Sequence, residues 1–304
     1  MAAYTYEKSL ENAYKVNWRI EEVLGDRQFD TSRPWLPAQL SGAAAISCLN
    51  DEEKMKLTHI ELGAYAHIFR FVEEFITPTM VNLAQAVELK EDDAFNALTN
   101  FAAEEVKHMA LFQRVRALVD EAIGFPLALL SNEQEVATVV LSKNIGAVLL
   151  LVEAIEWFTQ LHYLSGFKDG ETLDPLTRAV FKAHWQEEAQ HAHLDDLEIQ
   201  RAFGAMTAAE KDEATDDLID LVGAVDGLLQ EQVKMDVENL ARYLDRTFTE
   251  SESEEISSNL LRAKRYTFIE SGVTHENFLK TFTSVTTSQQ QEKVQTALRA
   301  LLQS

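Results

Sequence analysis

Cysteine is nearly absent from this chain of 304 residues, in which Cys48 is the only one. A lone thiol excludes an internal disulfide framework, and it excludes iron–sulfur or zinc sites built from several cysteines. Glycine and proline are also scarce, with 11 and 5 residues. Because these residues form turns and end helices, their scarcity favours an all-α fold of long helices with few connections.

Basic residues are outnumbered, with 27 Lys and Arg against 50 Asp and Glu and a net charge of −23. Nucleic-acid binding needs a basic surface, so we expect no nucleic-acid partner. The N-terminal segment lacks the apolar core of a signal peptide. The longest apolar stretch, at 147–158, contains Glu153 and Glu156, which indicates a buried helix rather than a membrane span. We therefore expect a cytoplasmic protein without membrane contact.

Apolar residues recur at helical spacing along most of the chain. The pattern predicts a polar helix at 5–24, an extended loop at 27–42, and long helices at 51–88, 91–123, 132–164 and 174–203. Pro78 falls inside the first long helix, where it either kinks that helix or begins a second helical piece. Gly124 and Pro126 end the second long helix, and Pro175 suits the first turn of the fourth.

The last hundred residues are helical in pattern as well. Helices are expected at 207–246, 252–270, 273–284 and 287–302. No turn-rich linker separates them from the preceding helices, and they contain no cluster of potential ligands. We expect a single all-α domain over 1–304, with a metal-binding four-helix core at 51–203. Accessory helices at 204–304 would pack on this core or serve dimerisation.

Two copies of a Glu-x-x-His motif stand out, at Glu105–His108 and at Glu188–His191. Residues three apart share one face of an α-helix, so each motif presents a carboxylate and an imidazole side by side. Divalent iron and manganese accept both ligand types, and a carboxylate can bridge two ions. One such motif is often only a surface pair, but two of them, each following an apolar helix with a glutamate, indicate a dimetal site in a four-helix bundle.

The first hairpin should supply a further carboxylate opposite Glu105. In an antiparallel hairpin, facing residues have a roughly constant sum of residue numbers, and a turn near 87–91 gives Glu73 and Glu74 the right height. Glu73 points away from the helix face that carries Ile68, Phe71 and Phe75. We therefore predict Glu74 as the ligand on this helix.

The second hairpin offers two candidates opposite Glu188, namely Glu153 and Glu156, which lie one turn apart in apolar surroundings. We favour Glu153 and keep Glu156 as the alternative. His184 precedes Glu188 by four residues on the same face, so it is a candidate third imidazole. Glu104 and Glu187, directly before the motif glutamates, are candidate acceptors for imidazole N–H groups of other helices, and the alternative is that they face solvent.

At these residues the chain resembles the ferritin-like diiron-carboxylate superfamily over about 51–203. The run His184-x-x-x-Glu188-x-x-His191 is similar to the p-aminobenzoate N-oxygenase family, in which the additional imidazole is a seventh protein ligand. The resemblance implies two iron ions held by Glu74, Glu105, His108, Glu153 or Glu156, His184, Glu188 and His191. It also implies a homodimer that reduces O2 to a bridging peroxo species and oxidises a small organic substrate, in that family an arylamine nitrogen.

Departures from related families narrow this interpretation. Ribonucleotide reductase small subunits carry a radical tyrosine one turn after the first motif histidine, where this chain has Phe112. No glycine-rich nucleotide fingerprint is present, so electrons must come from an external donor. The leading hypothesis is a diiron, O2-dependent oxidoreductase acting on a small molecule. The alternatives are an iron-binding protein of ferroxidase type without an organic substrate, and a manganese–iron enzyme that oxidises a long-chain lipid.

Overall fold

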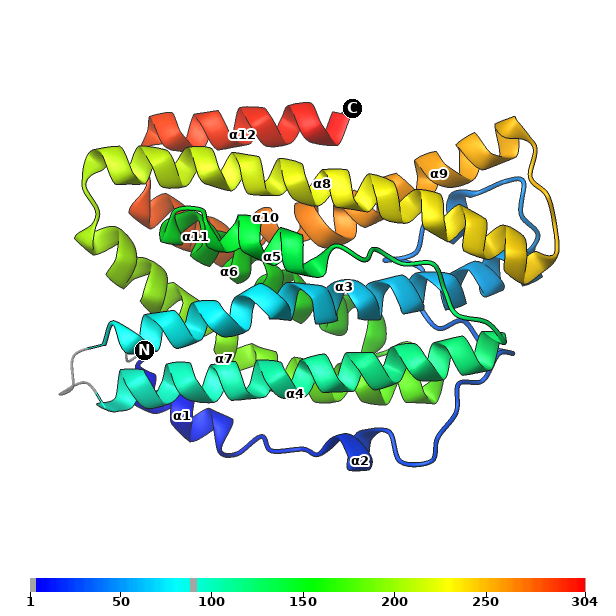
Figure 1. The fold of residues 1–304 in the computed structure, drawn as a ribbon, viewed down its shortest axis with the longest axis horizontal. Helices are drawn as coiled ribbons and strands as arrows, with labels where there is room; N and C mark the ends of the chain where they lie inside the picture. The colour runs from blue at the N-terminus through cyan, green and yellow to red at the C-terminus, as the bar shows by residue number, and fades with distance from the viewer. Residues whose placement is uncertain (1–3, 88–91, 304) are drawn as a thin grey trace.

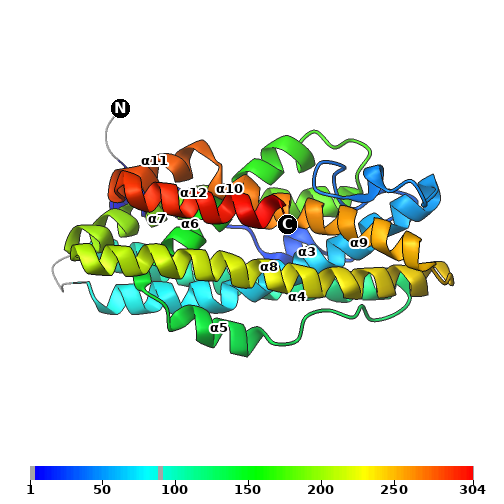
Figure 2. The ribbon, with the colours of Figure 1, turned by 90° about the horizontal axis from the view of Figure 1, so that it is seen from above.

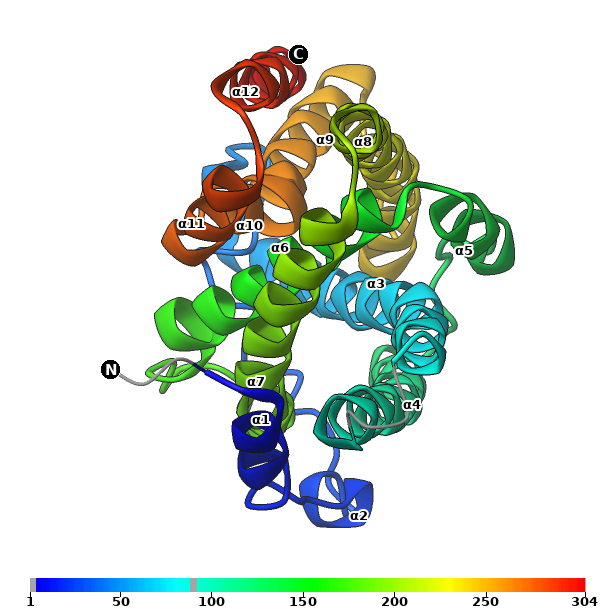
Figure 3. The same ribbon diagram turned by 90° about the vertical axis from the view of Figure 1, so that its left-hand side faces the viewer.

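The computed structural model describes residues 4–87 and 92–303, and every regular element within these ranges is helical. Four long helices form the central bundle shown in Figure 1: α3 (Asp51–Gln85), α4 (Asp92–Ile123), α6 (Ile145–His162) and α7 (Pro175–Ala205). Viewed along the bundle, α3 and α4 lie on one side and α6 and α7 on the other (Figure 3). The predicted all-α fold built on a four-helix bundle is confirmed.

The first hairpin follows the prediction closely. Asn50 caps α3 by accepting a hydrogen bond from the backbone N–H of Glu53, whose carboxylate accepts one from the N–H of Asn50. The helix continues through Pro78 to Gln85 without a second helical piece. The predicted turn at 87–91 falls mostly outside the described residues, and α4 is described from Asp92 onward.

The helix predicted at 132–164 is in fact two helices. The short helix α5 (Glu133–Leu141) lies on the outside of the molecule, as Figure 2 shows, and α6 begins separately at Ile145. The side chain of Asn144 accepts a hydrogen bond from the N–H of Gly146 and so caps a new helix. A Cβ atom at Gly146 would lie 2.8 Å from the Phe203 ring, so glycine lets the start of α6 approach α7 closely.

The second hairpin turns later than predicted. After His162 the chain continues in a π-helical turn, η2 (Tyr163–Phe167), before the loop that leads to α7. Asp174 caps α7 by accepting hydrogen bonds from the N–H groups of Leu176 and Thr177. The first arm of this hairpin therefore extends beyond its predicted end, and this change of register decides which glutamate meets α7.

The predicted N-terminal helix at 5–24 is interrupted. The structure contains α1 (Tyr6–Ala13) and the single turn α2 (Ile20–Val23), with a non-helical segment between them. Trp18 anchors this segment, because its carbonyl oxygen accepts a hydrogen bond from Lys107 on α4. The segment predicted as a loop at 27–42 is a loop, with the buried Trp35 donating its indole N–H to the carbonyl of Asp30.

The C-terminal helices pack on the bundle. They are α8 (Ala208–Leu244), α9 (Glu250–Arg265), the π-helical turn η3 (Tyr266–Glu270), α10 (Ser271–Val273), α11 (Glu276–Val285) and α12 (Ser288–Gln303). The long helix α8 covers α3 and α6, and α12 lies above it (Figures 1 and 3). The segment Ile145–Phe167 is long and apolar enough to cross a membrane, but 89% of its most apolar window is buried inside the fold. Its hydrophobicity is explained by its central position.

Candidate metal centre

The two Glu-x-x-His motifs meet in the interior of the bundle. Glu188 places Oε1 3.0 Å from Nδ1 of His108 and Oε2 2.9 Å from Nδ1 of His191. Glu105 mirrors this arrangement, with Oε1 2.9 Å from His191 Nδ1 and Oε2 3.7 Å from His108 Nδ1. Each carboxylate thus lies between the two imidazoles, which is where a ligand bridging two metal ions has to be.

The third helix of the bundle contributes Glu156. Its carboxylate lies in one group with Glu105, Glu188 and His191, whose ligand atoms are all within 4.8 Å of one another. Glu153 lies outside this group, and one of its oxygens accepts a hydrogen bond from the indole N–H of Trp157 at 3.3 Å. The cluster therefore contains Glu156, the alternative, and not the favoured Glu153. The π-helical turn lengthens the first arm of the hairpin and so brings Glu156 opposite Glu188.

The remaining helix contributes Glu73 and not the predicted Glu74. Glu73 forms a second group with His108 and His184, again within 4.8 Å. The carboxylate of Glu74 instead pairs with Arg70 at 3.0 Å and is partly exposed. The prediction of Glu74 is thus wrong in position by one residue.

The error has a physical cause, since α3 has two apolar faces. The face used to orient this helix in the sequence, with Ile68, Phe71 and Phe75, lines a cavity beneath α5 and α8. The opposite apolar positions, Phe69, Ile76 and Met80, are buried toward the bundle interior and share the face of Glu73. A single helix can present two apolar faces when helices cover it on both sides, and the sequence alone does not distinguish them.

His184 lies at the centre, as its position in the sequence suggested. Its Nε2 is 2.6 Å from Oε1 of Glu188 and 3.7 Å from Oε1 of Glu73. Phe69 and Phe112 pack edge-on against its ring, with centroids 5.2 Å and 4.8 Å away. The position where relatives have a radical tyrosine is thus an apolar wall beside this imidazole.

The imidazoles of the two motifs are held from outside by the acids that precede the motif glutamates. His108 Nε2 lies 2.8 Å from Glu187, and His191 Nε2 lies 2.8 Å from Glu104. The expectation that these two acids receive imidazole N–H groups of other helices is confirmed. When Nε2 donates outward in this way, Nδ1 is left free to bind a metal ion.

Lys107 and Trp18 join Glu104 and Glu187 in an outer layer of residues that contact the motif imidazoles or the acids that hold them. The sequence alone identifies neither Lys107 nor Trp18. Lys107 forms an ion pair with the buried Glu187 and lies 4.2 Å above the ring of Trp18. The Trp18 ring stacks on His108 at 5.9 Å. Lys107 could have been noticed as the residue beside a motif histidine, whereas nothing local to the sequence links Trp18 to the centre.

The protonation tendencies of the cluster reveal a shortage of positive charge. Burial, reinforced by the neighbouring Glu105, raises the pKa of Glu73 well above its ordinary value. Burial and the proximity of Glu188 do the same to the pKa of Glu156. Burial opposes the charge of His108 and His191, but the adjacent Glu188 outweighs it and raises both pKa values well above the usual range. Burial opposes the charge of Glu188 and Glu105 as well, but the imidazoles outweigh it and lower the pKa of both. The buried positive charge available in the cluster therefore favours ionisation of these two carboxyls and not of Glu73 and Glu156.

The donor set fits two divalent cations. Its side chains, Glu73, Glu105, His108, Glu156, His184, Glu188 and His191, are all at most 3% exposed. Some of these atoms lie close to an oppositely charged group, as Oε1 of Glu105 does to Nδ1 of His191. Seven of the donor atoms nevertheless make no hydrogen bond of acceptable geometry: both oxygens of Glu73, Oε1 of Glu105, Nδ1 of His108, Oε2 of Glu156 and both nitrogens of His184. Unsatisfied buried donor atoms are costly without a ligand, and a metal pair would satisfy them together.

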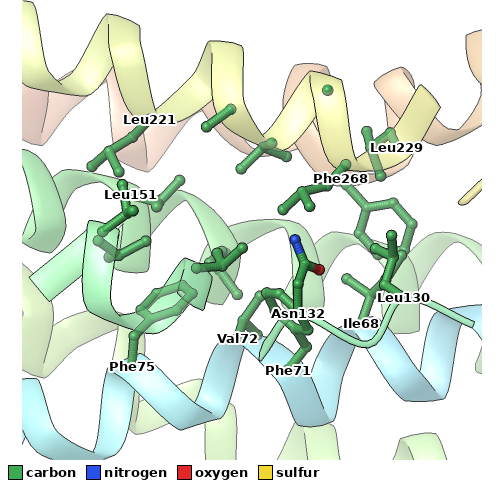
Figure 4. A pocket seen from close by; sticks show the side chains of 18 of the residues that line it. Ile68, Phe71, Val72, Phe75, Leu130, Asn132, Leu151, Leu221, Leu229 and Phe268 are labelled. Atoms are coloured by element: carbon green, nitrogen blue, oxygen red, sulfur yellow. The ribbon is translucent and has the colours of Figure 1, made fainter. Parts of the chain in front are cut away.

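An apolar cavity of about 340 Å³ lies next to the centre, between α3, α5, α6 and α8. Figure 4 shows side chains from these helices around it, including Phe75, Leu151 and Leu221. Phe69 also lines the cavity, so one side chain borders both the cavity and His184.

Comparison with known proteins identifies a family. No curated protein matches the sequence significantly. Among solved structures, variants of an R2-like ligand-binding oxidase with Mn/Mn or Mn/Fe cofactors share 15% identity with the chain. One has a TM-score of 0.43 and covers 86% of this chain and 92% of its own, and another has a TM-score of 0.42 and covers 87% and 94%.

The family model described as p-aminobenzoate N-oxygenase AurF matches residues 3–241, which include all four helices of the bundle. This match, together with the buried carboxylate and imidazole cluster, makes the protein an O2-dependent oxidoreductase with a ferritin-like fold, a dimetal centre and an organic substrate. The chain belongs to the p-aminobenzoate N-oxygenase family.

Proposed function

We propose that seven side chains hold two iron ions, with manganese in one position as the alternative. They are Glu73, Glu105, His108, Glu156, His184, Glu188 and His191. The observation that carries this proposal is their convergence from four helices into one water-poor interior, with inward-facing atoms that lack hydrogen bonds. Iron and manganese accept the same carboxylate and imidazole ligands, so the donor set does not choose between them.

Charge supports two divalent ions rather than one. Four ionised carboxylates neutralise two such cations, and the three imidazoles add no charge when neutral. Glu105 and Glu188 would each help to hold both ions, because each has one oxygen beside His108 and the other beside His191. Glu73 and His184 lie on the His108 side, and Glu156 lies on the His191 side.

The reaction we propose is the N-oxygenation of a small organic amine. One O2, two electrons and two protons convert a primary amine into a hydroxylamine and one water, so that a new N–O bond forms and one N–H bond breaks. The metal pair supplies the activation of O2 when it is bound. The electrons come from an external donor, since the sequence contains no glycine-rich nucleotide fingerprint.

The protein's own residues position and shield this chemistry. Glu104 and Glu187 hold His191 and His108 with Nδ1 turned inward. Phe69 and Phe112 enclose the ring of His184 and exclude water from that side. The cavity bordered by Phe69 is the approach for the organic substrate.

We also place the protein in the cytoplasm as a homodimer without nucleic-acid or membrane partners. The acidic composition supports the lack of a nucleic-acid partner, the burial of the apolar segment Ile145–Phe167 supports the lack of a membrane partner, and the family resemblance supports the dimer. Light scattering of the purified protein tests the dimer, and a mass equal to one chain would contradict it.

Metal loading of neighbouring variants tests the ligand set. The purified protein is loaded anaerobically with ferrous iron and its metal content is measured by mass spectrometry, with two ions per chain expected. Glu73→Ala should lose metal while Glu74→Ala keeps it, and Glu156→Ala should lose metal while Glu153→Gln keeps it. Equal metal content in Glu73→Ala and the unmodified protein would contradict the assignment.

A single turnover tests the reaction. The loaded protein is mixed with 18O-labelled O2 and an aromatic amine, and the products are analysed by mass spectrometry. A labelled hydroxylamine or its oxidation product supports N-oxygenation. Uptake of many irons per chain with O2 consumption but no labelled organic product would favour the ferroxidase function instead.

A further inference from the structure

The cavity beside the centre is almost entirely apolar. Among the described residues, its lining includes Ile68, Phe75, Leu151, Leu221 and Phe268 (Figure 4). Pockets for small ligands commonly measure roughly 300–1,000 Å³, so about 340 Å³ is enough for one aromatic ring with a short substituent. Such a lining favours a compact hydrophobic molecule.

The cavity adjoins the proposed metal centre through the side chain of Phe69, and none of the proposed ligands is part of its described lining. Val72 and Ile155 line the cavity, and each directly precedes a proposed ligand, Glu73 and Glu156 respectively. Phe69 lines it as well, and its ring meets His184 nearly at a right angle, with an interplanar angle of 85°. Phe69 is therefore the side chain that borders both a molecule in the cavity and the imidazole of His184.

The outer end carries acidic groups and an amide. Glu135 and Glu231 line it and are exposed to solvent. Asn132 extends its amide between α3 and α8 (Figure 4), and its buried Oδ1 has no hydrogen-bond partner. Among the described residues that line the cavity, none is Lys, Arg or His. Lys234, one turn from Glu231, forms an ion pair with that carboxylate and is not part of the lining.

This distribution of charge selects against an anionic substrate. A carboxylate in the cavity would lose its water and find no cation, and an unpaired buried charge is strongly unfavourable. A neutral group would bind without that penalty, and a hydrogen-bond donor or a cation would find Asn132, Glu135 or Glu231. The outer end thus suits a group opposite in character to the carboxylate of an aminobenzoate.

We propose that the substrate of this protein is a hydrophobic primary aromatic amine whose far end is neutral or cationic, and that aminobenzoates are excluded by the lining of this cavity. This inference rests on the proposed function, since it takes the cavity as the substrate's approach to the centre. It adds the class of substrate, which the ligand set does not determine.

Binding of a matched pair of amines tests the inference directly. Isothermal titration calorimetry of the metal-loaded protein without O2, and of the metal-free protein, compares 4-butylaniline with 4-aminobenzoate at neutral pH. We expect 4-butylaniline to bind at least about ten-fold more tightly, because only the benzoate buries an unpaired charge. Equal or tighter binding of 4-aminobenzoate would overturn the inference.

Two glycines on α8 provide a blocking variant and its control. Gly227 lines the cavity, whereas Gly223, one turn earlier, does not, and a Cβ atom at either position meets nothing within 4 Å. Gly227→Trp should weaken the binding of 4-butylaniline about ten-fold by filling the outer end. Gly223→Trp adds the same side chain to the same helix and should leave it unchanged. An unaltered affinity in Gly227→Trp would show that the ligand binds elsewhere.

A charge introduced into the lining should reverse the preference. Leu228 is half-buried and lines the cavity. Leu228→Arg should improve the binding of 4-aminobenzoate at least about ten-fold by supplying its missing cation, whereas Leu228→Met should not. No gain with arginine would contradict the electrostatic basis of the selection.

The design separates failure of the inference from failure of the proposed function. If the protein takes up two metal ions but prefers 4-aminobenzoate, the substrate class is wrong and the metal centre stands. If the protein takes up no metal, the proposed function fails. The calorimetry of the metal-free protein then still supports or overturns the selectivity of the cavity.

Discussion

The two helical hairpins of the bundle carry the same motif but do not contribute equally. The α3–α4 hairpin supplies Glu73, Glu105 and His108, and the α6–α7 hairpin supplies Glu156, His184, Glu188 and His191. In the proposed ligand set, the extra imidazole would give the position beside His108 two nitrogen ligands and the position beside His191 one. In the proposed centre, a repeated sequence motif would therefore produce two metal positions that differ in the number of nitrogen donors.

The outer layer adds to the difference. Glu187, which holds His108, is neutralised by Lys107 from the opposite hairpin. Glu104, which holds His191, also accepts a hydrogen bond from the neutral amide of Gln190 at 3.0 Å, and within residues 4–87 and 92–303 no Lys or Arg forms an ion pair with it. The comparison teaches that the asymmetry extends beyond the ligands to the groups that orient them.

The largest loss of metal binding is expected on substitution of Glu188, which contacts imidazoles of both hairpins. Glu188 approaches all three imidazoles, with contacts of 2.6 Å to His184, 3.0 Å to His108 and 2.9 Å to His191. Glu188→Ala should abolish binding of both ions and remove the rise in Tm that iron produces, measured by metal analysis and scanning fluorimetry. Lys182→Ala, on the exposed side of α7, serves as control. Retention of both ions would contradict a shared role.

Removing His184, the imidazole that has no counterpart in the other hairpin, should affect iron binding at one of the two metal positions more than at the other. His184→Ala should reduce iron from about two ions to about one per chain, because only the position beside His108 loses a ligand. His191→Ala should empty the other position, and the double variant should hold almost no iron. A fully loaded His184→Ala protein with normal O2 uptake would show that six ligands suffice.

Buried carboxyls outside the centre offer a pH-dependent comparison. Burial raises the pKa of Glu61 on α3 to about 7 and that of Glu153 on α6 to about 8, from an ordinary value of 4.5. Because the fold favours their protonated forms, this stabilisation is complete below pH 4.5 and is lost as pH rises through 7 or 8. The free energy of unfolding relative to Glu61→Gln should fall by roughly 3 kcal/mol across this range.

Urea unfolding at a series of pH values measures this effect. The decline should continue to higher pH when Glu153→Gln is the reference, because the pKa of Glu153 is the higher of the two. A difference that is independent of pH would mean that both carboxyls are ionised in the folded protein.

The smallest effect is expected in the outer layer. Lys107→Met should destabilise the protein by about 2 kcal/mol, since it leaves the buried Glu187 without its cation, partial exposure of Lys107 limiting the loss. Gln190→Met should cost about 1 kcal/mol, because only a neutral hydrogen-bond donor is removed. Chemical unfolding curves measure both effects. Equal losses of unfolding free energy in the two variants would contradict the asymmetry of the outer layer.

The range of each interaction explains what the sequence could predict. Contacts within one helix follow from spacing, so Glu105 with His108 and Glu188 with His191 were found directly. The register between helices was not predictable to one residue, because it depends on the break before Ile145 and on the π-helical turn at Tyr163–Phe167.

The same limit applies to orientation and to distant partners. Glu74 was chosen over Glu73 because α3 is apolar on two sides, and only the helices around it reveal which side faces the centre. Trp18 stacks on His108, which is far from it in the sequence, and it lies in a non-helical segment between α1 and α2 where the sequence predicts a helix. Such contacts depend on the completed tertiary packing, and no local pattern encodes them.

The double-sided character of α3 has a consequence for how this protein can change. Its inward residues include the proposed ligand Glu73, while Ile68 and Phe71 on its outward face line the cavity proposed for the organic molecule. Replacements of Ile68 or Phe71 can therefore change which molecule the cavity accepts without replacing a proposed metal ligand. The choice of organic substrate and the binding of metal thus depend on different faces of the single helix α3.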